Sequence, residues 1–160
     1  MSNWPPDFTA SARPVFPQEF PHLKPHHCKP DLSPATTDYN CIAWAASDTD
    51  NWWWPDDPLI GYGYWPNGVD RRETIEAFVA AYQTVGFERC DDGILEVGFE
   101  KIAIYALKGV PTHAARQLAD GNWTSKLGPF EDIVHLTLEC LKGPLYGEPD
   151  TYMRRPAKTV

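Results

Sequence analysis

Cys41 and His113 are the two residues of this 160-residue chain whose types and surroundings suit covalent chemistry. Cys41 follows two polar residues and opens an apolar run, residues 42–46. If that run is a buried helix, the thiol lies at its N-terminal end, where unpaired backbone N–H groups and the helix dipole favour a thiolate. His113 lies in the β-prone segment 112–118 and could take the proton of such a thiol. The two side chains predict a cysteine nucleophile with a histidine base.

A third polar group is needed to hold the other imidazole nitrogen, and its identity depends on a hairpin register. Asp120-Gly121 is a strong turn signal after the His113 strand. A two-residue turn there puts Thr124 and Lys126 on the face of His113, whereas a three-residue loop puts Ser125 there. The sequence does not choose between these registers.

Three residues remain candidates for this third role. Ser125 is the most natural one, Asn122 replaces it if the hairpin is shifted, and His135 competes as a base or as a second partner of the imidazole. The alternative to a catalytic role is a purely structural one: a buried cysteine at position 41 and a hydrogen-bonded core histidine at position 113.

Aromatic residues dominate the segment 47–69, among many glycines and prolines. They alternate neither as a strand nor as a helix, so we expect an irregular cover over the first helix. Core filling is one role for these rings. The other is that Trp54 and Trp65 wall a substrate groove beside Cys41, with Asn40 and Asn122 as further groove candidates. Either Asp38 or Asn40 is available as the cap of the Cys41 helix.

The remaining patterns predict an α+β domain. The i, i+3, i+4, i+7 spacing of apolar residues predicts a helix over 70–85, begun by Asp70 and ended by Gly86. We expect strands at 98–107, 112–118 and 123–128 and a last edge strand at 151–156. Residues 130–141 are either a short helix or a strand, and a short helical or irregular segment is the favoured prediction.

Composition bounds the class of protein. With 22 acidic against 14 basic residues and a net charge of −8, the surface disfavours nucleic acid, and Arg154-Arg155 is the longest basic run. No apolar stretch is long enough for a membrane span or a secretory signal, so we expect a cytoplasmic monomer with free thiols. The cluster His26-His27-Cys28 lacks a partner pair at ligand spacing, so no metal and no other cofactor is expected.

Residues 1–38, rich in proline, predict an extended strap that packs on a single domain at 39–156, and 157–160 predict a frayed tail.

Two resemblances accompany these residues. The segments YNCIAWA (39–45), THAARQL (112–118) and WTSKLG (123–128) are similar to an uncharacterised bacterial domain family with no established activity. More distantly, a polar residue before a helix-opening cysteine, then a strand histidine and a polar residue on the next strand, resembles NlpC-like and other papain-fold cysteine hydrolases. This second resemblance implies a papain-like fold, in which a helix bearing Cys41 and a second helix pack on an antiparallel sheet, with His113 and Ser125 completing the site.

The chain departs from those hydrolases in two ways. They usually follow the cysteine with serine and glycine, where this chain has Ile42-Ala43, and they are usually exported. The primary hypothesis is a cysteine hydrolase or acyltransferase that acts on an amide, isopeptide or thioester bond, such as one in a peptide substrate. The alternative is a non-catalytic acidic module, effector- or antitoxin-like, that binds a basic protein partner.

Overall fold

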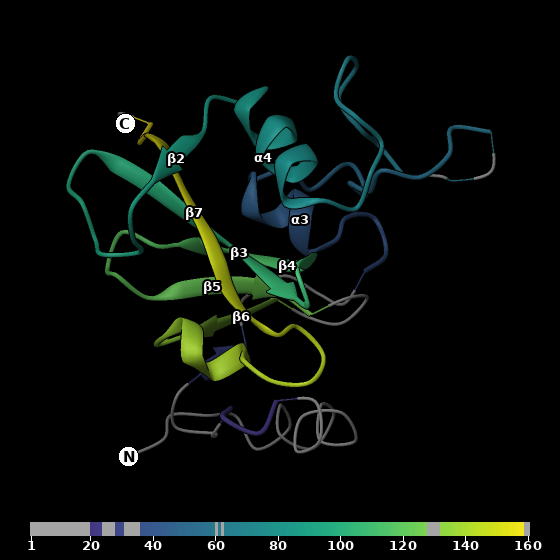
Figure 1. Ribbon diagram of the computed structural model, residues 1–160. Helices are drawn as coiled ribbons and strands as arrows, with labels where there is room; N and C mark the ends of the chain where they lie inside the picture. Colours follow the sequence, from purple (N-terminus) through teal and green to yellow (C-terminus); the bar gives the residue numbers. More distant parts are fainter. Residues whose placement is uncertain are drawn as a thin grey trace.

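The computed structural model describes residues 20–23, 28–30, 36–59, 61, 63–127 and 132–158 (Figure 1). Most of the expected strap at 1–38 lies outside these residues, and so do the side chains of His26-His27-Cys28. From the part of the strap that is described, Phe20 is buried and packs against Tyr146, with 5.1 Å between ring centroids.

Seven antiparallel strands form one sheet in the order β1-β6-β5-β4-β3-β7-β2. They are β1 (Cys28–Pro30), β2 (Glu88–Cys90), β3 (Phe99–Leu107), β4 (Val110–Gln117), β5 (Trp123–Lys126), β6 (Asp132–His135) and β7 (Glu148–Pro156). The described helices are α3 (Cys41–Ala45), α4 (Ile75–Gln83) and the 3-10 helix η2 (Leu138–Leu141). This arrangement confirms the predicted α+β class.

Both α-helices lie on one face of the sheet (Figure 1). Side chains alternate along β3, so Ile102 and Ile104 point into the apolar layer beneath the helices. Within this layer the Tyr82 hydroxyl of α4 donates to the Ile42 carbonyl of α3, at 2.8 Å, and joins the two helices.

The opposite face of the sheet carries a second apolar layer. It contains Tyr105 of β3 and Ala115 of β4, together with side chains from outside the central strands: Phe20, Trp123, Leu141 and Tyr146. The central strands β3 and β4 are therefore covered on both faces, and a polar side chain on either face is enclosed.

Helix α4 begins later than the sequence predicts. Thr74, not Asp70, is its N-cap, because the Thr74 hydroxyl accepts from the Ala77 N–H at 3.2 Å. Its end is as predicted, since Gly86 adopts the left-handed φ of +95° just after it. No helix in the described part of the chain is both long and apolar enough to cross a membrane.

Two further predictions for the C-terminal part need correction. The segment predicted as short helical or irregular contains a strand, β6, because Ile133 and Val134 join the ladder of β5 before η2 begins. The predicted last edge strand is β7, which lies inside the sheet between β3 and β2. The three-residue strand β2 takes the edge position that the sequence pattern assigned to β7.

Gly147 should tolerate no side chain. Its φ is +75°, and a Cβ there would lie 2.0 Å from the Ala106 carbonyl oxygen. We expect Gly147→Ala to lower the free energy of unfolding by about 2–3 kcal/mol, measured by urea titration. Gly86→Ala is the matched control, because its φ is similar but its Cβ would meet nothing within 4 Å, so about 1 kcal/mol is expected. Equal losses in the two variants would contradict this account.

Candidate functional site

Cys41 opens α3, as the sequence predicts, but it lies deep in the fold. Burial raises the pKa of its thiol to about 11. The backbone N–H groups of Ala114, Ile42 and Cys41 itself, and the positive charge of Lys126, act in the opposite direction without overcoming burial. The resting sulfur is thus a neutral thiol, and the nearby backbone N–H groups and Lys126 lower its pKa only in part.

Asn40 anchors the start of α3. Its side-chain oxygen accepts from the N–H groups of Ala43 and Trp53, both at 3.1 Å, and its amide nitrogen donates to the Trp53 carbonyl at 2.7 Å. With every contact directed at the backbone, Asn40 fixes the helix that carries Cys41 and does not face a groove.

Replacing Asn40 by alanine should be costly for folding. The change removes a helix cap and leaves the buried Trp53 N–H and carbonyl groups unpaired, so we expect a loss of about 2–3 kcal/mol in the free energy of unfolding. Urea titration measures the loss. Asn51→Ala is the control, since this exposed amide contacts only Asp48 and should cost about 0.5 kcal/mol or less. A loss of that size at Asn40 would show that the cap is unimportant.

His113 belongs to a buried chain of polar contacts that runs across three strands. Its Nε2 lies 3.0 Å from Ser125 Oγ on β5, and Ser125 Oγ lies 2.8 Å from His135 Nε2 on β6. His135 Nδ1 lies 2.8 Å from the Thr137 carbonyl oxygen. The structure thus brings together two of the three predicted catalytic residues, and adds His135, which the sequence presented only as a competitor.

Both imidazoles are neutral at physiological pH. Burial lowers the pKa of His135 to about 4. Burial, and then the nearby charge of protonated His135, lower the pKa of His113 well below its usual range. His113 Nδ1 is enclosed and has no hydrogen-bond partner among the described residues. Among the described residues, this nitrogen is therefore a buried polar atom left without a hydrogen bond.

No hydrogen bond joins the Cys41 sulfur to the His113 ring. The ring stacks on Tyr146, at 4.1 Å between centroids, on the face of the sheet away from α3. The sulfur lies on the helix side, beside the backbone N–H of Ala114, the residue that follows His113. The expected direct pair in an open cleft is thus not formed: the two groups approach β4 from opposite faces, and both are enclosed.

The strand pairing leaves part of β4 without a partner strand next to α3. Among the described residues, β5 pairs with β4 only at Arg116 and Gln117, so β4 has no strand partner on that side from Ala115 back to its start. Both β4 and β5 contact α3, and the Cys41 sulfur at the start of α3 lies beside the Ala114 N–H of β4.

Buried polar residues concentrate in α3, β4, β5 and β6. Eight of the ten buried polar or charged residues of the described chain belong to these elements or to their caps: Asn40, His113, Gln117, Thr124, Ser125, Lys126, Asp132 and His135. A sheet needed only for stability would place apolar side chains there, because each buried polar group must be matched by a partner. This concentration of perturbed groups marks the region as the candidate site.

Sequence reasoning missed Lys126 and Asp132 as members of the site. They lie directly opposite each other in the β5–β6 ladder, and both are fully buried. Lys126 Nζ donates to the Thr36 carbonyl at 2.8 Å and lies 5.3 Å from the Tyr39 ring centre. The Tyr39 hydroxyl donates to Asp132 at 3.1 Å. The β-branched residues at 133–134 could have indicated both side chains. They favour a strand for β6, and pairing of that strand with β5 turns Asp132 inward opposite Lys126.

The predicted groove residues lie elsewhere. Trp65 packs on Phe78 of α4 and donates from its ring nitrogen to the Asp70 carbonyl, and Trp54 meets Phe78 edge-on. Both tryptophans therefore cover α4. Asn122 contacts Asp120 within the exposed hairpin and does not reach the imidazole.

One surface hollow of about 270 Å³ lies at the far end of β3 and β4, and it is lined by Phe99, Glu100, Arg116, Leu118 and neighbouring residues. None of Cys41, His113 and Ser125 lines it. The candidate site is enclosed, because Cys41 keeps only 8% of its surface exposed and His113, Ser125 and His135 keep none.

Comparison with known proteins gives one match. No curated protein and no solved structure matches the chain. The family model of a domain of unknown function, DUF7689, matches residues 31–154, a range that contains every residue of the candidate site. Since this match covers most of the chain, the protein belongs to the DUF7689 family.

Proposed function

We propose that this domain is a papain-like cysteine hydrolase or acyltransferase, described here in a closed form, with Cys41 as nucleophile, His113 as base and Ser125 as the residue that holds the imidazole. One observation carries the proposal: His113 Nε2 is bonded to Ser125, while its Nδ1 is buried and finds no partner in the described part of the chain. The proposal is supported by the Cys41 thiol lying beside the N–H of Ala114, in a stretch of β4 that has no β5 partner among the described residues.

The reaction follows from these positions. As the thiol passes its proton to His113 Nδ1, the sulfur attacks the carbonyl carbon of an amide, isopeptide or thioester. The Cys41 backbone N–H stabilises the oxyanion that forms. The imidazolium returns the proton to the leaving amine or thiol, and a water or a second nucleophile then releases the acyl group from sulfur. Because the site is closed, β4 and α3 must shift enough to admit substrate and bring Nδ1 to the sulfur.

The test is an acyl-enzyme. Purified protein is exposed to an activated thioester, an aryl ester and a peptide anilide, and adducts are located by intact-mass and peptide mass spectrometry. We expect one acyl group on Cys41, and none in Cys41→Ala. Acylation of Cys90 or Cys140 alone, or of no cysteine, would refute the proposal. Cys90→Ser is the matched control, since Cys90 is a half-buried thiol outside the site.

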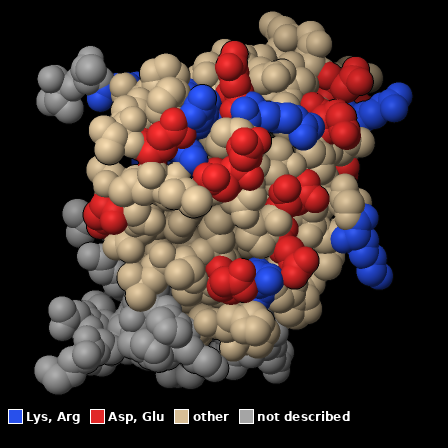
Figure 2. Space-filling model, turned by 60° about the vertical axis from the view of Figure 1, so that its left-hand side comes forward, with Lys and Arg blue, Asp and Glu red and all other residues tan. Residues whose placement is uncertain are grey.

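A second candidate function, binding of a basic protein partner, is favoured by the loop at 91–98. Its aliphatic side chains Ile94, Leu95 and Val97 are 71%, 46% and 97% exposed. Three large aliphatic groups exposed within four residues are typical of an interaction site. They stand among acidic residues, and Figure 2 shows acidic and basic groups interleaved around uncharged surface on one face.

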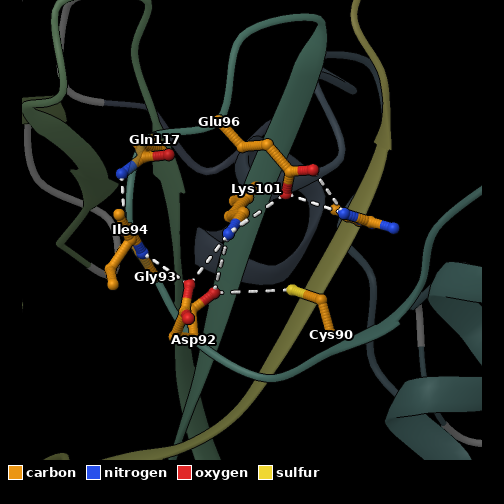
Figure 3. Close-up of polar contacts among 8 residues, drawn as sticks. Cys90, Asp92, Gly93, Ile94, Glu96, Lys101 and Gln117 are labelled. Carbon is orange, nitrogen blue, oxygen red and sulfur yellow. Dashed lines mark hydrogen bonds and ion pairs between the residues drawn. The ribbon is translucent and has the colours of Figure 1, made fainter.

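This loop is held firmly on the sheet (Figure 3). Lys101 Nζ lies 3.0 Å from Asp92 and 3.5 Å from Glu96, and Gln117 donates to the Gly93 carbonyl at 2.7 Å. Glu96 also accepts from Arg154 at 2.7 Å. Because these contacts order the loop before binding, its apolar side chains can dock with little loss of conformational freedom.

The binding function is tested on a reconstituted pair. A partner that copurifies with the protein is purified separately, and the dissociation constant is measured at two salt concentrations. For a basic partner docked on this loop, Ile94→Ser with Val97→Ser should weaken binding at least about tenfold, and added salt should weaken it further. Leu136→Ser is the control, because this leucine is about half exposed outside the loop. Equal binding by all three proteins would exclude the loop as the docking site.

A further inference from the structure

The polar chain across β4, β5 and β6 has only one consistent arrangement of protons. The Thr137 carbonyl can only accept, so the proton of neutral His135 is on Nδ1. His135 Nε2 then has a lone pair, and the Ser125 hydroxyl donates to it. With its proton used in this way, Ser125 Oγ accepts from His113, which must carry its proton on Nε2.

We propose that His135 is a positioning residue: acting through Ser125, it holds His113 in the Nε2–H tautomer and leaves Nδ1 as the atom that receives the thiol proton. This inference rests on the proposed hydrolase function. Without His135 the serine hydroxyl could equally donate to His113 Nε2, and the proton of His113 would then be on Nδ1, where it blocks the base.

The packing around His113 restricts the orientation of its ring, so the main property left to be set is which ring nitrogen carries the proton. Tyr146 stacks on the His113 ring with 8° between planes, and Tyr105 meets its edge at 5.3 Å. Solvent does not reach the polar chain to supply another hydrogen-bond donor, because all three of its side chains are fully buried: His113, Ser125 and His135. A neutral serine can therefore select one tautomer only because a second histidine fixes the direction of its hydroxyl.

Nitrogen-15 NMR of the histidine rings tests this directly, since protonated and unprotonated ring nitrogens differ widely in chemical shift. At pH 7 we expect Nε2–H for His113 and Nδ1–H for His135. In His135→Leu the signal of His113 should change to the Nδ1–H tautomer. In His135→Gln, whose amide can accept from Ser125 and donate to the Thr137 carbonyl, the Nε2–H tautomer should return. His22→Gln, a change at an exposed histidine, should leave both signals unchanged.

Turnover of the acyl substrate supplies the second readout. A wrong histidine tautomer costs on the order of 10⁴ in kcat in a serine protease, so we expect His135→Leu to lose about 10²-fold or more and His135→Gln to recover most of it. An Nδ1–H tautomer of His113 in the unmodified protein would overturn the inference, even if Cys41 forms an acyl adduct. Correct tautomers without any adduct would instead refute the hydrolase function and leave the tautomer assignment standing.

Discussion

Replacing His113 by alanine is expected to lower kcat/KM for an acyl substrate by about 10²–10⁴-fold, and Cys41→Ala to abolish acyl transfer. The loss should be this large because burial keeps the thiol neutral, with its pKa raised to about 11, so the sulfur depends on an adjacent base. Steady-state hydrolysis of the thioester measures both changes. Cys90→Ser should retain the unmodified rate.

The pH dependence separates a neutral pair from a preformed ion pair. Since the pKa of His113 is lowered and that of Cys41 is raised, thiol and imidazole are both neutral from about pH 7 to pH 10. We expect kcat/KM to be level across this range. A decrease near pH 8.5 would indicate a thiolate–imidazolium pair and contradict the neutral-pair mechanism, as would a His113→Ala variant that turns over at the unmodified rate.

Acidification should destabilise the fold through the same histidines. Burial lowers the pKa of His135 from 6.5 to about 4. Below pH 6.5 the unfolded chain takes up a proton at this residue that the folded chain refuses, so stability falls as pH falls towards 4. His135 alone should cost about 2 kcal/mol by pH 5 and about 3 kcal/mol by pH 4, relative to pH 7. His113, with its pKa also lowered, adds to the loss.

Urea unfolding at pH 7, 6 and 5 measures this loss in a range where carboxylates contribute little. Side-chain hydrogen bonds to Lys101 and Arg154 lower the pKa values of Asp92 and Glu96, which therefore remain ionised in this range. His135→Gln should remove about 2 kcal/mol of the loss at pH 5. A flat profile down to pH 5, or equal slopes for the unmodified protein and His135→Gln, would disprove the buried neutral state of His135.

Local patterns were sufficient for some elements. The polar pair before Cys41 predicted a capped helix start, and Asn40 is its cap. The strand bearing His113 was also predicted from its composition, because β-prone residues and the Asp120-Gly121 turn are short-range signals. The start of α4 was misplaced because Asp70 and Thr74 are both suitable caps, and the choice depends on which residue aligns the apolar face of the helix with the sheet.

The partner of the imidazole required the three-dimensional register. Arg116 pairs with Thr124 and Gln117 with Trp123, so the longer hairpin loop is formed and Ser125 shares a face with His113. A shift of one residue would have presented Thr124 and Lys126 instead. Nothing local distinguishes these registers, because each buries some polar side chains, and the decision lies in the packing of Trp123 against the second apolar layer.

By itself, the sequence determined which groups are present and which local structures carry them: a thiol at a helix start, a histidine in a strand, a net negative charge and an α+β pattern. Only the tertiary structure decided that His135 and Ser125 meet His113, that Lys126 and Asp132 turn inward, and that the whole site is enclosed. The reason is that strand register and desolvation arise from contacts between segments distant in the chain, and these contacts set both the partners of a buried polar group and its pKa.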